Sequence, residues 1–233
     1  MYLPIKRILD VAIALTMLLA LSPIFIIIML LLSLTGEGEV FYHQERVGFK
    51  NRRFKIWKFA TMLKNSPNLG TGDVTIANDP RLIPLGAFLR KTKLNELPQL
   101  VNVLKGEMAI VGPRPLMAKG FERYPQQIQR KIYDVKPGIT GIGSVIFRDE
   151  ETIVSKSLDY ESTYCKINNC KGELELWYQK KKSFITDVTI IFLTVWVIIF
   201  RKSNLVYKLF PGLPFLNEAY LLESSTEEEK FIA

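Results

Sequence analysis

The N-terminal apolar segment is the feature that most constrains how this chain can fold. No charged residue occurs between Val11 and Leu34, and a helix of that length, rising about 1.5 Å per residue, would cross a hydrocarbon core of about 30 Å. Ser22-Pro23 lies near the middle of the segment. Pro23 removes a backbone hydrogen bond and bends a helix, and the Ser22 hydroxyl can bond to a carbonyl that the bend leaves free. The segment therefore suits a kinked spanning helix or a hairpin that enters and leaves the membrane by the same face.

Basic residues on both sides of this segment favour the hairpin. Lys6 and Arg7 precede it, and all of the other Lys and Arg residues follow it, in a chain of formal net charge +8. Cationic segments stay on the cytoplasmic side of a membrane, although long domains follow this rule less strictly. We therefore expect a re-entrant helix hairpin over residues 1–36 in preference to a kinked spanning helix. A cleaved signal peptide is the least favoured alternative, because the run is too long and has no small-residue cleavage site.

The remainder of the 233-residue chain is long enough for one domain with its own core. The sequence pI of about 9.4 indicates anionic partners. Next to a membrane segment, these are more plausibly phospholipid headgroups and phosphorylated substrates than nucleic acid. A surface that only holds the protein against acidic headgroups would have the same composition. Cys165 and Cys170 are the only cysteines and His43 the only histidine; a zinc site needs about four ligands, so we expect two reduced thiols.

A β-hairpin is predicted after the apolar segment. Val40–Tyr42 and Phe54–Phe59 are rich in aromatic and β-branched residues, and the turn Gly48–Asn51 separates them. Lys58 lies among the aromatic residues of the second strand. This arrangement is typical either of a cationic edge at the headgroup level or of a solvent-facing strand over a core. Residues 64–80 contain turn formers throughout and indicate a loop, and loops of this length often cover binding sites.

Two short helices are expected next, with a charged residue at the start of the second. The first covers residues 82–90, and the second begins with Asn95 as its N-cap, has Pro98 in its first turn and ends at Gly106. This pattern places Glu96 at a helix N-terminus, where a phosphate, or a carboxylate that holds Mg²⁺ against a phosphate, is stabilised. A capped helix with an acidic first turn and no ligand would show the same pattern.

Two proline- and glycine-rich segments follow. In Ile110–Pro115, prolines on both sides of Arg114 present its guanidinium on a stiff turn after a buried strand. Such an arginine can bind a phosphate through two hydrogen bonds. The segment from Lys136 to Gly143 combines a rigid turn with three glycines and a hydroxyl, which allows close backbone approach to a ligand. A tight structural loop has the same composition, and the glycine pattern alone is weak evidence.

The C-terminal third indicates further membrane contact. Trp177-Tyr178 and Lys180–Lys182 precede the uncharged stretch Val188–Phe200, which is too short to span and is typical of an interfacial helix. A buried core helix is the alternative. Residues 223–233 predict a disordered acidic tail, and no role is predicted for residues 206–222.

Together these motifs occur in the order found in bacterial sugar transferases. They are Ser22-Pro23, KFATM at 58–62, DPR at 79–81, LRKTKLNELPQLVNVLKGEM at 89–108, VGPRP at 111–115 and PGITG at 137–141. Over residues 1 to about 205, the chain resembles the small monotopic phosphoglycosyl transferases of that family. The resemblance implies transfer of a sugar 1-phosphate from a nucleoside diphosphate sugar, expected to be a UDP-sugar, to polyprenyl (undecaprenyl) phosphate. The reaction uses Mg²⁺ and starts a glycan.

The resemblance also implies an architecture and a location. The expected fold is α+β and mainly helical, with the re-entrant membrane helix over 1–36, a catalytic domain with a β-hairpin and interfacial amphipathic helices over 37–205, and a C-terminal extension over 206–233. The protein would be monotopic in the bacterial inner membrane, with its catalytic domain on the cytoplasmic face. Its expected partners are the nucleotide sugar, polyprenyl phosphate and membrane phospholipids, with no nucleic acid; a homodimer stays open.

Individual roles are carried over from matching positions of the family. Glu96 matches the second member of an Asp-Glu dyad and is the expected Mg²⁺ ligand, while Arg90 and Arg114 match residues that hold phosphates. Lys58 matches a family lysine, but Ala60 replaces an arginine common in that motif, which weakens the prediction of donor contacts there. The expected contacts to the nucleotide or sugar come from the loop residues Pro137, Gly138, Thr140 and Gly141.

Asn95 is the main departure from the family pattern. The family has an aspartate there, which attacks the donor phosphate and forms a phosphosugar-enzyme intermediate. A neutral amide is a poor nucleophile, so the two-step covalent route should be inefficient in this chain. The sequence then allows an engineered substitution, a natural member that joins its substrates directly, or an inactive membrane-bound relative that acts as a scaffold. For the direct route, Mg²⁺ on Glu96 with Arg90 and Arg114 would align the substrates, and Asn95 would orient them.

Overall fold

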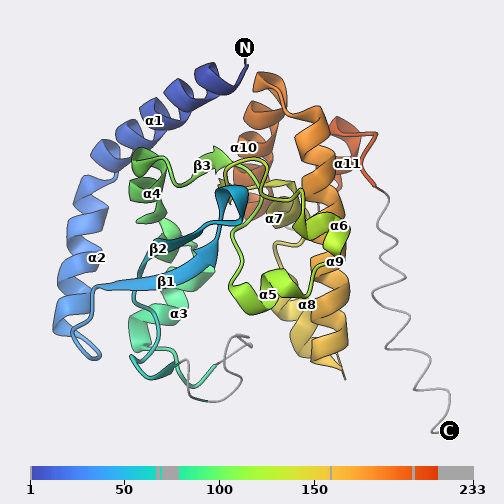
Figure 1. Ribbon diagram of the computed structural model, residues 1–233. Coiled ribbons are helices and arrows are strands. Elements are labelled where there is room, and N and C mark those ends of the chain that lie inside the picture. Colours follow the sequence, from blue (N-terminus) through green and yellow to red (C-terminus); the bar gives the residue numbers. More distant parts are fainter. Residues whose placement is uncertain (1, 67–68, 70–78, 158, 201–202, 215–233) are drawn as a thin grey trace, which may run out of the picture.

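A computed structural model describes residues 2–66, 69, 79–157, 159–200 and 203–214. It has a mainly helical α+β fold with small two-stranded sheets, as the sequence predicts (Figure 1). Much of the loop expected at 64–80 and the whole acidic tail expected at 223–233 lie outside the described residues.

The N-terminal apolar segment forms two helices that meet at a bend. Helix α1 (Tyr2–Ala20) and helix α2 (Ser22–Leu34) are inclined by 63° to each other. The Ser22 hydroxyl donates to the carbonyl oxygen of Leu19 at 2.8 Å, which is the carbonyl that an N–H at position 23 would otherwise bond. The bend and its hydroxyl partner are therefore confirmed.

Neither helix of this pair is long and apolar enough to cross a membrane by itself. Among the described residues, only the bent pair taken together has the length and apolar composition of a spanning segment. Large apolar side chains are exposed along both helices. They include Leu3, Ile5, Ile8, Leu15, Met17, Leu19, Ile24, Ile26, Ile27, Leu30, Leu31 and Leu34.

The polar beginning of α1 is tied to the rest of the protein. Arg7 donates to the carbonyl oxygens of Val103 and Leu104 at 2.6 and 2.9 Å, at the C-terminal end of helix α4 (Gln99–Lys105). Asp10 accepts a hydrogen bond of 3.0 Å from the backbone N–H of Ile110 in strand β3 (Ala109–Val111). These bonds fix the direction of α1 relative to the segments that carry Glu96 and Arg114.

The predicted β-hairpin is confirmed. Strands β1 (Phe41–Val47) and β2 (Arg53–Phe59) pair antiparallel, with His43 opposite Trp57, and the short 3-10 helix η1 (Phe49–Asn51) joins them. Phe59 is buried against Ile28 of α2 in a small apolar cluster. The hairpin thus packs on α2 at one end.

The segment around Asn95 differs from the expected capped helix. Helix α3 (Pro84–Lys91) is followed by a 3-10 turn, η3 (Leu94–Glu96), and α4 begins only at Gln99 with Pro98 as its N-cap. The prediction that Asn95 is the N-cap was therefore wrong. The turn closes through a 3.2 Å bond from Leu97 N–H to the Leu94 carbonyl, so the α-helical pattern starts later. Gly106 ends the helix as expected, with a φ of +83°.

The glycine-rich segment after Lys136 is part of a second, parallel two-stranded sheet. Strand β4 (Gly138–Thr140) pairs with β3. The backbones of Gly112 and Gly138 approach so closely that a Cβ on Gly138 would lie 2.1 Å from the Gly112 nitrogen. These glycines therefore permit the tight backbone packing that the sequence left as one alternative.

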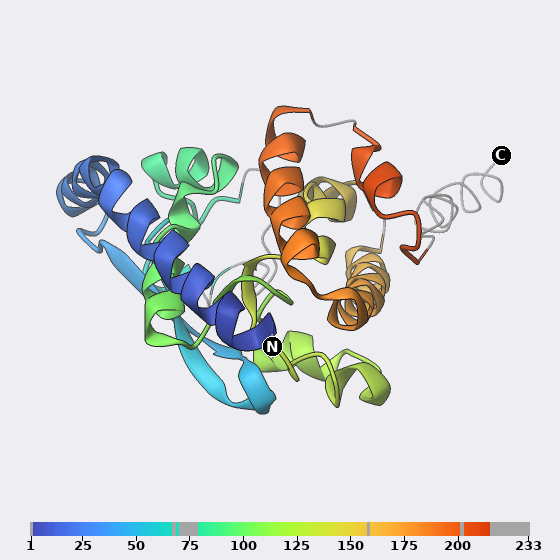
Figure 2. The same ribbon diagram turned by 90° about the horizontal axis from the view of Figure 1, so that it is seen from above.

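The remaining helices form the other side of the molecule (Figures 1 and 2). They are α5 (Ala118–Glu122), α6 (Gln126–Gln129), α7 (Ile142–Ile146), α8 (Glu150–Lys156), α9 (Tyr160–Lys181), α10 (Phe184–Ile199) and α11 (Leu205–Leu209). The main apolar core lies between α7, α9, α10, β3 and α4.

Helix α10 has one face buried in the core and one apolar face exposed, so it has features of both the core helix and the interfacial helix that its sequence allowed. Ile190, Leu193 and Val197 are buried in the main core. The opposite face is apolar and exposed, with Phe184, Ile185, Val188, Phe192, Val195, Ile198 and Ile199.

Candidate active site

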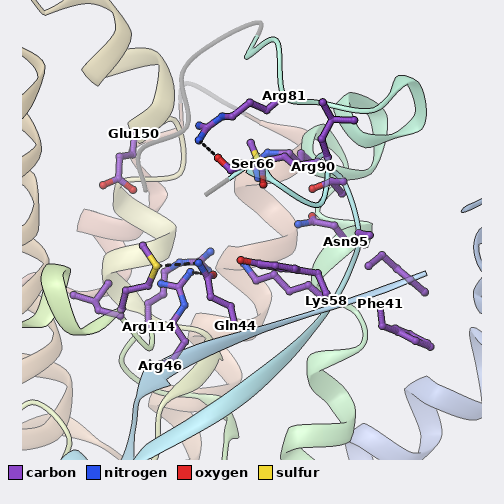
Figure 3. Close-up of a pocket in the computed structure, with 18 of the residues that line it drawn as sticks. Phe41, Gln44, Arg46, Lys58, Ser66, Arg81, Arg90, Asn95, Arg114 and Glu150 are labelled. Carbon is purple, nitrogen blue, oxygen red and sulfur yellow. Dashed lines mark hydrogen bonds between the residues drawn. The ribbon is translucent and has the colours of Figure 1, made fainter. Parts of the chain in front are cut away.

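A cavity of about 480 Å³ lies between the β-hairpin, the α3–η3 segment and the α8–α9 helices. Figure 3 shows Lys58 and Asn95 on one wall, with Arg90 near Asn95 and Arg114 across the cavity. The structure thus brings together four of the predicted site residues on β2, α3, η3 and the turn after β3.

Glu96, the expected metal ligand, is paired with two of these cations. Its Oε1 accepts from Arg114 Nη2 at 2.6 Å and from Lys58 Nζ at 3.2 Å, and its Oε2 accepts from Arg114 Nη1 at 3.2 Å. The arginine is therefore bidentate toward a carboxylate, the geometry that a guanidinium also uses toward phosphate.

Burial and charge shift the pKa values in this cluster. Burial alone would raise the pKa of the Glu96 carboxyl, but the charges of Arg114 and Lys58 outweigh it and hold that pKa well below its usual range. Burial lowers the pKa of Lys58 to about 7, because Glu96 offsets only part of the cost of desolvating the ammonium and Arg114 repels it. The carboxylate is thus ionised and shared between competing cations.

The turn that carries Arg114 is held by a buried tyrosine. The Tyr133 hydroxyl donates to the Arg114 carbonyl at 2.9 Å and accepts from the Leu116 N–H at 3.0 Å. The backbone on both sides of the guanidinium is therefore fixed. Tyr133 was not predicted as a site residue, since only tertiary packing brings it to this turn.

Arg46 is a further cation at the cavity, and it was not predicted from the sequence as a site residue. It lines the cavity from β1 and donates to the side chain of Gln44 and, at 3.4 Å, to the Pro115 carbonyl. Burial and the nearby charge of Arg114 lower the pKa of Arg46 to about 10. Arg46, Lys58 and Arg114 together exceed the single negative charge of Glu96, so this part of the cavity favours an anion.

Asn95 is buried at the cavity wall, with 5% of its surface exposed. Its Oδ1 has no hydrogen-bond partner among the described residues. An unpaired buried amide oxygen costs about 1–3 kcal/mol. A ligand in the cavity that offers a donor or a cation would remove this cost.

Comparison with known proteins identifies the family. The profile of the family described as bacterial sugar transferase matches residues 1–201. The chain belongs to the bacterial sugar transferase family. The resemblance predicted from the motifs is therefore confirmed.

Relatives from Erwinia amylovora and Escherichia coli are named as transferases that act on lipid carriers or undecaprenyl phosphate. The chain is 34% identical over 213 residues to a UDP-galactose-lipid carrier transferase of Erwinia amylovora, covering 85% of this chain and 41% of that protein. It is 37% identical over 193 residues to a UDP-glucose:undecaprenyl-phosphate glucose-1-phosphate transferase of Escherichia coli, covering 82% and 39%. The exopolysaccharide production protein ExoY of Sinorhizobium fredii is 31% identical, covering 82% and 83%. The chain thus spans about two fifths of the length of the first two relatives.

Side-chain oxygens beside the cavity suit the Mg²⁺ ion that the resemblance to the family implies. No group of three or more His, Cys, Asp or Glu side chains comes together within the described part of the chain. Mg²⁺ is commonly bound by one or two protein oxygens, with waters and substrate phosphates as the other ligands. The Glu96 carboxylate and the unpaired Asn95 oxygen supply such a set, although Glu96 would first have to share its contacts with Arg114 and Lys58.

The predicted loop residues Pro137, Gly138, Thr140 and Gly141 do not line this cavity. Gly138 N–H bonds to the Pro113 carbonyl at 2.9 Å, and the Thr140 hydroxyl bonds to that of Thr194 at 2.7 Å. In the described structure the loop therefore supports the turn that carries Arg114. Its contact with a substrate stays a prediction.

Asp79 and Arg81 of the DPR motif form a buried structural pair. Arg81 donates to Asp79 at 2.6 and 2.8 Å and to the Ser66 and Leu69 carbonyls at 3.0 and 3.1 Å. Arg81 and Ser66 both line the cavity (Figure 3). Among the described residues, the motif thus holds the backbone of Ser66 and Leu69 next to Arg81.

Proposed function

We propose that this chain transfers a sugar 1-phosphate from a nucleoside diphosphate sugar, a UDP-sugar by analogy with its relatives, to polyprenyl phosphate. The single observation that carries the proposal is the convergence of Lys58, Arg90, Arg114 and Asn95 on one cavity. The names of the relatives from Erwinia amylovora and Escherichia coli support the same reaction.

The cationic wall would bind the phosphates of donor and acceptor. Arg114 already presents two N–H groups to the Glu96 carboxylate, and a phosphate can accept the same pair. Phosphoryl transfer depends chiefly on positioning and on neutralising charge. Lys58, Arg90 and Arg114 therefore serve to bring two anionic substrates together against their mutual repulsion.

Asn95 favours a single displacement. An oxygen of polyprenyl phosphate would attack the sugar-bearing phosphorus of the donor, forming a new P–O bond while the bond from that phosphorus to the nucleoside monophosphate breaks. The nucleoside monophosphate leaves with the bridging oxygen, and polyprenyl-diphosphate-sugar is the other product. The Asn95 amide orients the attacking group without forming a covalent intermediate. Glu96 and Asn95 would hold Mg²⁺, whose charge neutralises the reacting phosphates when it is bound.

The apolar surface suggests where the lipid substrate arrives. Helices α2, α3, α10 and α11 lie along one edge of the molecule in Figure 2, and the turn of the β-hairpin lies at the opposite edge. Each of these four helices has large apolar side chains that are exposed, among them Phe88 of α3 and Leu209 of α11. We place the apolar edge in the membrane as a monotopic anchor, with residues 37–205 on the cytoplasmic face of the bacterial inner membrane. The headgroup of polyprenyl phosphate would then meet a soluble donor beside α3.

The test is release of nucleoside monophosphate from a panel of UDP-sugars with undecaprenyl phosphate and Mg²⁺. The direct route predicts UMP only when both substrates are present. A burst of UMP with donor alone would contradict it. The Asn95→Asp variant should change the rate by less than about tenfold on this account. An increase of several orders of magnitude would show that Asn95 disables a nucleophile, and no lipid product from either protein would favour a scaffold.

A further inference from the structure

A second group of polar side chains lines the same cavity on the side formed by α8 and α9. It consists of Glu150, Tyr164, Asn168 and Lys171, and the phosphate chemistry proposed above uses none of them. Figure 3 shows Glu150 across the cavity from Asn95. We refer to these four residues as the α8–α9 group.

Two atoms of this group are buried without a hydrogen-bond partner among the described residues. They are Asn168 Nδ2, on a side chain that is 1% exposed, and Glu150 Oε1. One is a donor and the other an acceptor. Leaving each unpaired costs about 1–3 kcal/mol, so the site has an unsatisfied demand for a ligand that both donates and accepts.

The charge of the group suits a neutral ligand. Lys171 Nζ bonds to Glu150 Oε2 at 2.5 Å, so the ammonium and the carboxylate neutralise each other. The free oxygen of Glu150 can only accept a hydrogen bond while ionised, and it would repel a phosphate. The excess positive charge of the cavity lies instead around Arg46, Lys58 and Arg114.

A nucleobase fits this group less well than a sugar ring. The Watson–Crick edge of uracil presents one N–H between two carbonyl oxygens. One oxygen could accept from Asn168 Nδ2 while the N–H donates to Glu150, but the other oxygen would then lie beside the carboxylate and be repelled by it. Neighbouring sugar hydroxyls can each donate and accept. One hydroxyl can donate to Glu150 Oε1 while the next accepts from Asn168 Nδ2.

We propose that the α8–α9 group binds the hydroxyl-bearing sugar ring of the nucleotide sugar, and that Glu150 and Asn168 determine which sugars are accepted. This inference rests on the proposed function for the identity of the donor. The phosphates would lie toward Arg114, and the sugar would point to α9.

Binding measurements test the subsite without turnover. Isothermal titration calorimetry would compare UDP with a panel of UDP-sugars on the whole 233-residue chain in detergent. The UDP-sugars should differ from one another in affinity by about tenfold, the change expected from one or two hydrogen bonds to a buried charged group. Glu150→Gln and Asn168→Leu should remove this difference and leave the affinity for UDP unchanged. Glu173→Gln, an exposed residue of α9 away from the cavity, is the matched control.

A UDP-sugar that lacks one hydroxyl group tests which sugar hydroxyl contacts Glu150. A UDP-sugar that lacks the contacted hydroxyl should bind about tenfold more weakly to the wild-type protein and show no further loss with Glu150→Gln. Thermal unfolding of each variant checks that the fold is retained, and Glu150→Gln preserves the size of a side chain that is only partly buried.

The outcomes separate the two proposals. Loss of UDP affinity in Glu150→Gln, with sugar discrimination unchanged, would place the nucleotide here and overturn the subsite. Equal affinity of the wild-type protein for every UDP-sugar would also overturn it. Tight UDP-sugar binding that depends on Glu150, without any lipid-linked product, would retain the subsite and contradict the transferase function.

Discussion

At the scale of single residues, the carboxylate of Glu96 organises the cationic wall. Its contacts with Arg114 and Lys58 keep two cations at the cavity before any phosphate arrives. A buried cation with a paired carboxylate avoids most of the cost of an isolated buried charge. On the proposed function, substrate phosphates would replace or share those contacts.

Arg114→Lys should lower kcat/KM for UMP release by about 10- to 100-fold, because a lysine keeps the charge but cannot form the bidentate contact. Steady-state kinetics over a range of donor concentrations would measure this. The control is Arg53→Lys, which alters an exposed pair with Glu45 outside the cavity and should leave the rate unchanged. Equal rates for wild type and Arg114→Lys would remove Arg114 from phosphate binding.

Glu175 supplies a pH-dependent contribution to stability. It is buried, accepts a 3.1 Å bond from the Gly143 N–H, and burial raises its pKa from 4.5 to about 8. The folded state therefore holds this proton more tightly than the unfolded chain. Stability from this group is present below pH 4.5 and is lost as the pH rises toward 8, with a limiting slope of about 1.4 kcal/mol per pH unit.

Thermal unfolding of wild type and Glu175→Gln at pH 5 and pH 8 tests this contribution. The wild-type protein should lose more stability between the two values than the variant, which cannot ionise at position 175. Glu173→Gln, exposed on the same helix, should behave as wild type. An identical pH dependence in wild type and Glu175→Gln would contradict the assignment.

Among the structural elements, the sequence predicted correctly those whose cause lies in neighbouring residues. Pro23 removes a hydrogen bond at a known position, and the β-hairpin follows from two aromatic and β-branched segments around a turn. The start of α4 could not be predicted from neighbouring residues, because Asn95 is buried in a 3-10 turn instead of capping the helix. The sequence also could not show that Arg46 lines the cavity or that Tyr133 holds the Arg114 turn, because both depend on how distant segments pack.

Pro23→Ala should straighten the α1–α2 bend, since an N–H at this position can bond to the Leu19 carbonyl. A straight helix of that length would span the membrane and carry the N-terminus to the other side. The measurement is labelling of Leu3→Cys, in a Cys165→Ser, Cys170→Ser background, with a membrane-impermeant maleimide on intact cells. We expect protection when Pro23 is present and labelling in the Pro23→Ala variant; labelling of both proteins would contradict the re-entrant topology.

At the scale of the whole molecule, the cavity and the apolar edge belong to one arrangement. Helix α3 carries Arg90 into the cavity and exposes Phe88 at the apolar edge. Arg7 and Asp10 tie α1 to α4 and β3. The N-terminal helix pair is therefore tied to the segments that carry the cavity residues, an arrangement that would suit the proposed transfer to a lipid-embedded substrate.

A bimane label on Phe88→Cys should be quenched by brominated lipids, whereas the same label on Phe49→Cys should not. Both side chains are exposed, but Phe49 lies at the turn of the hairpin, on the opposite edge from α3. The comparison uses the protein without its native cysteines in vesicles. Equal quenching at the two positions would contradict the proposed membrane face.

The most direct measurement of the central claim follows both products of transfer from a radiolabelled UDP-sugar to undecaprenyl phosphate with Mg²⁺. Lipid-linked sugar diphosphate and UMP should appear in equal amounts, only when both substrates are present, and much more slowly with Arg114→Lys. Binding of UDP-sugar without any lipid-linked product, for every donor of the panel, would contradict it.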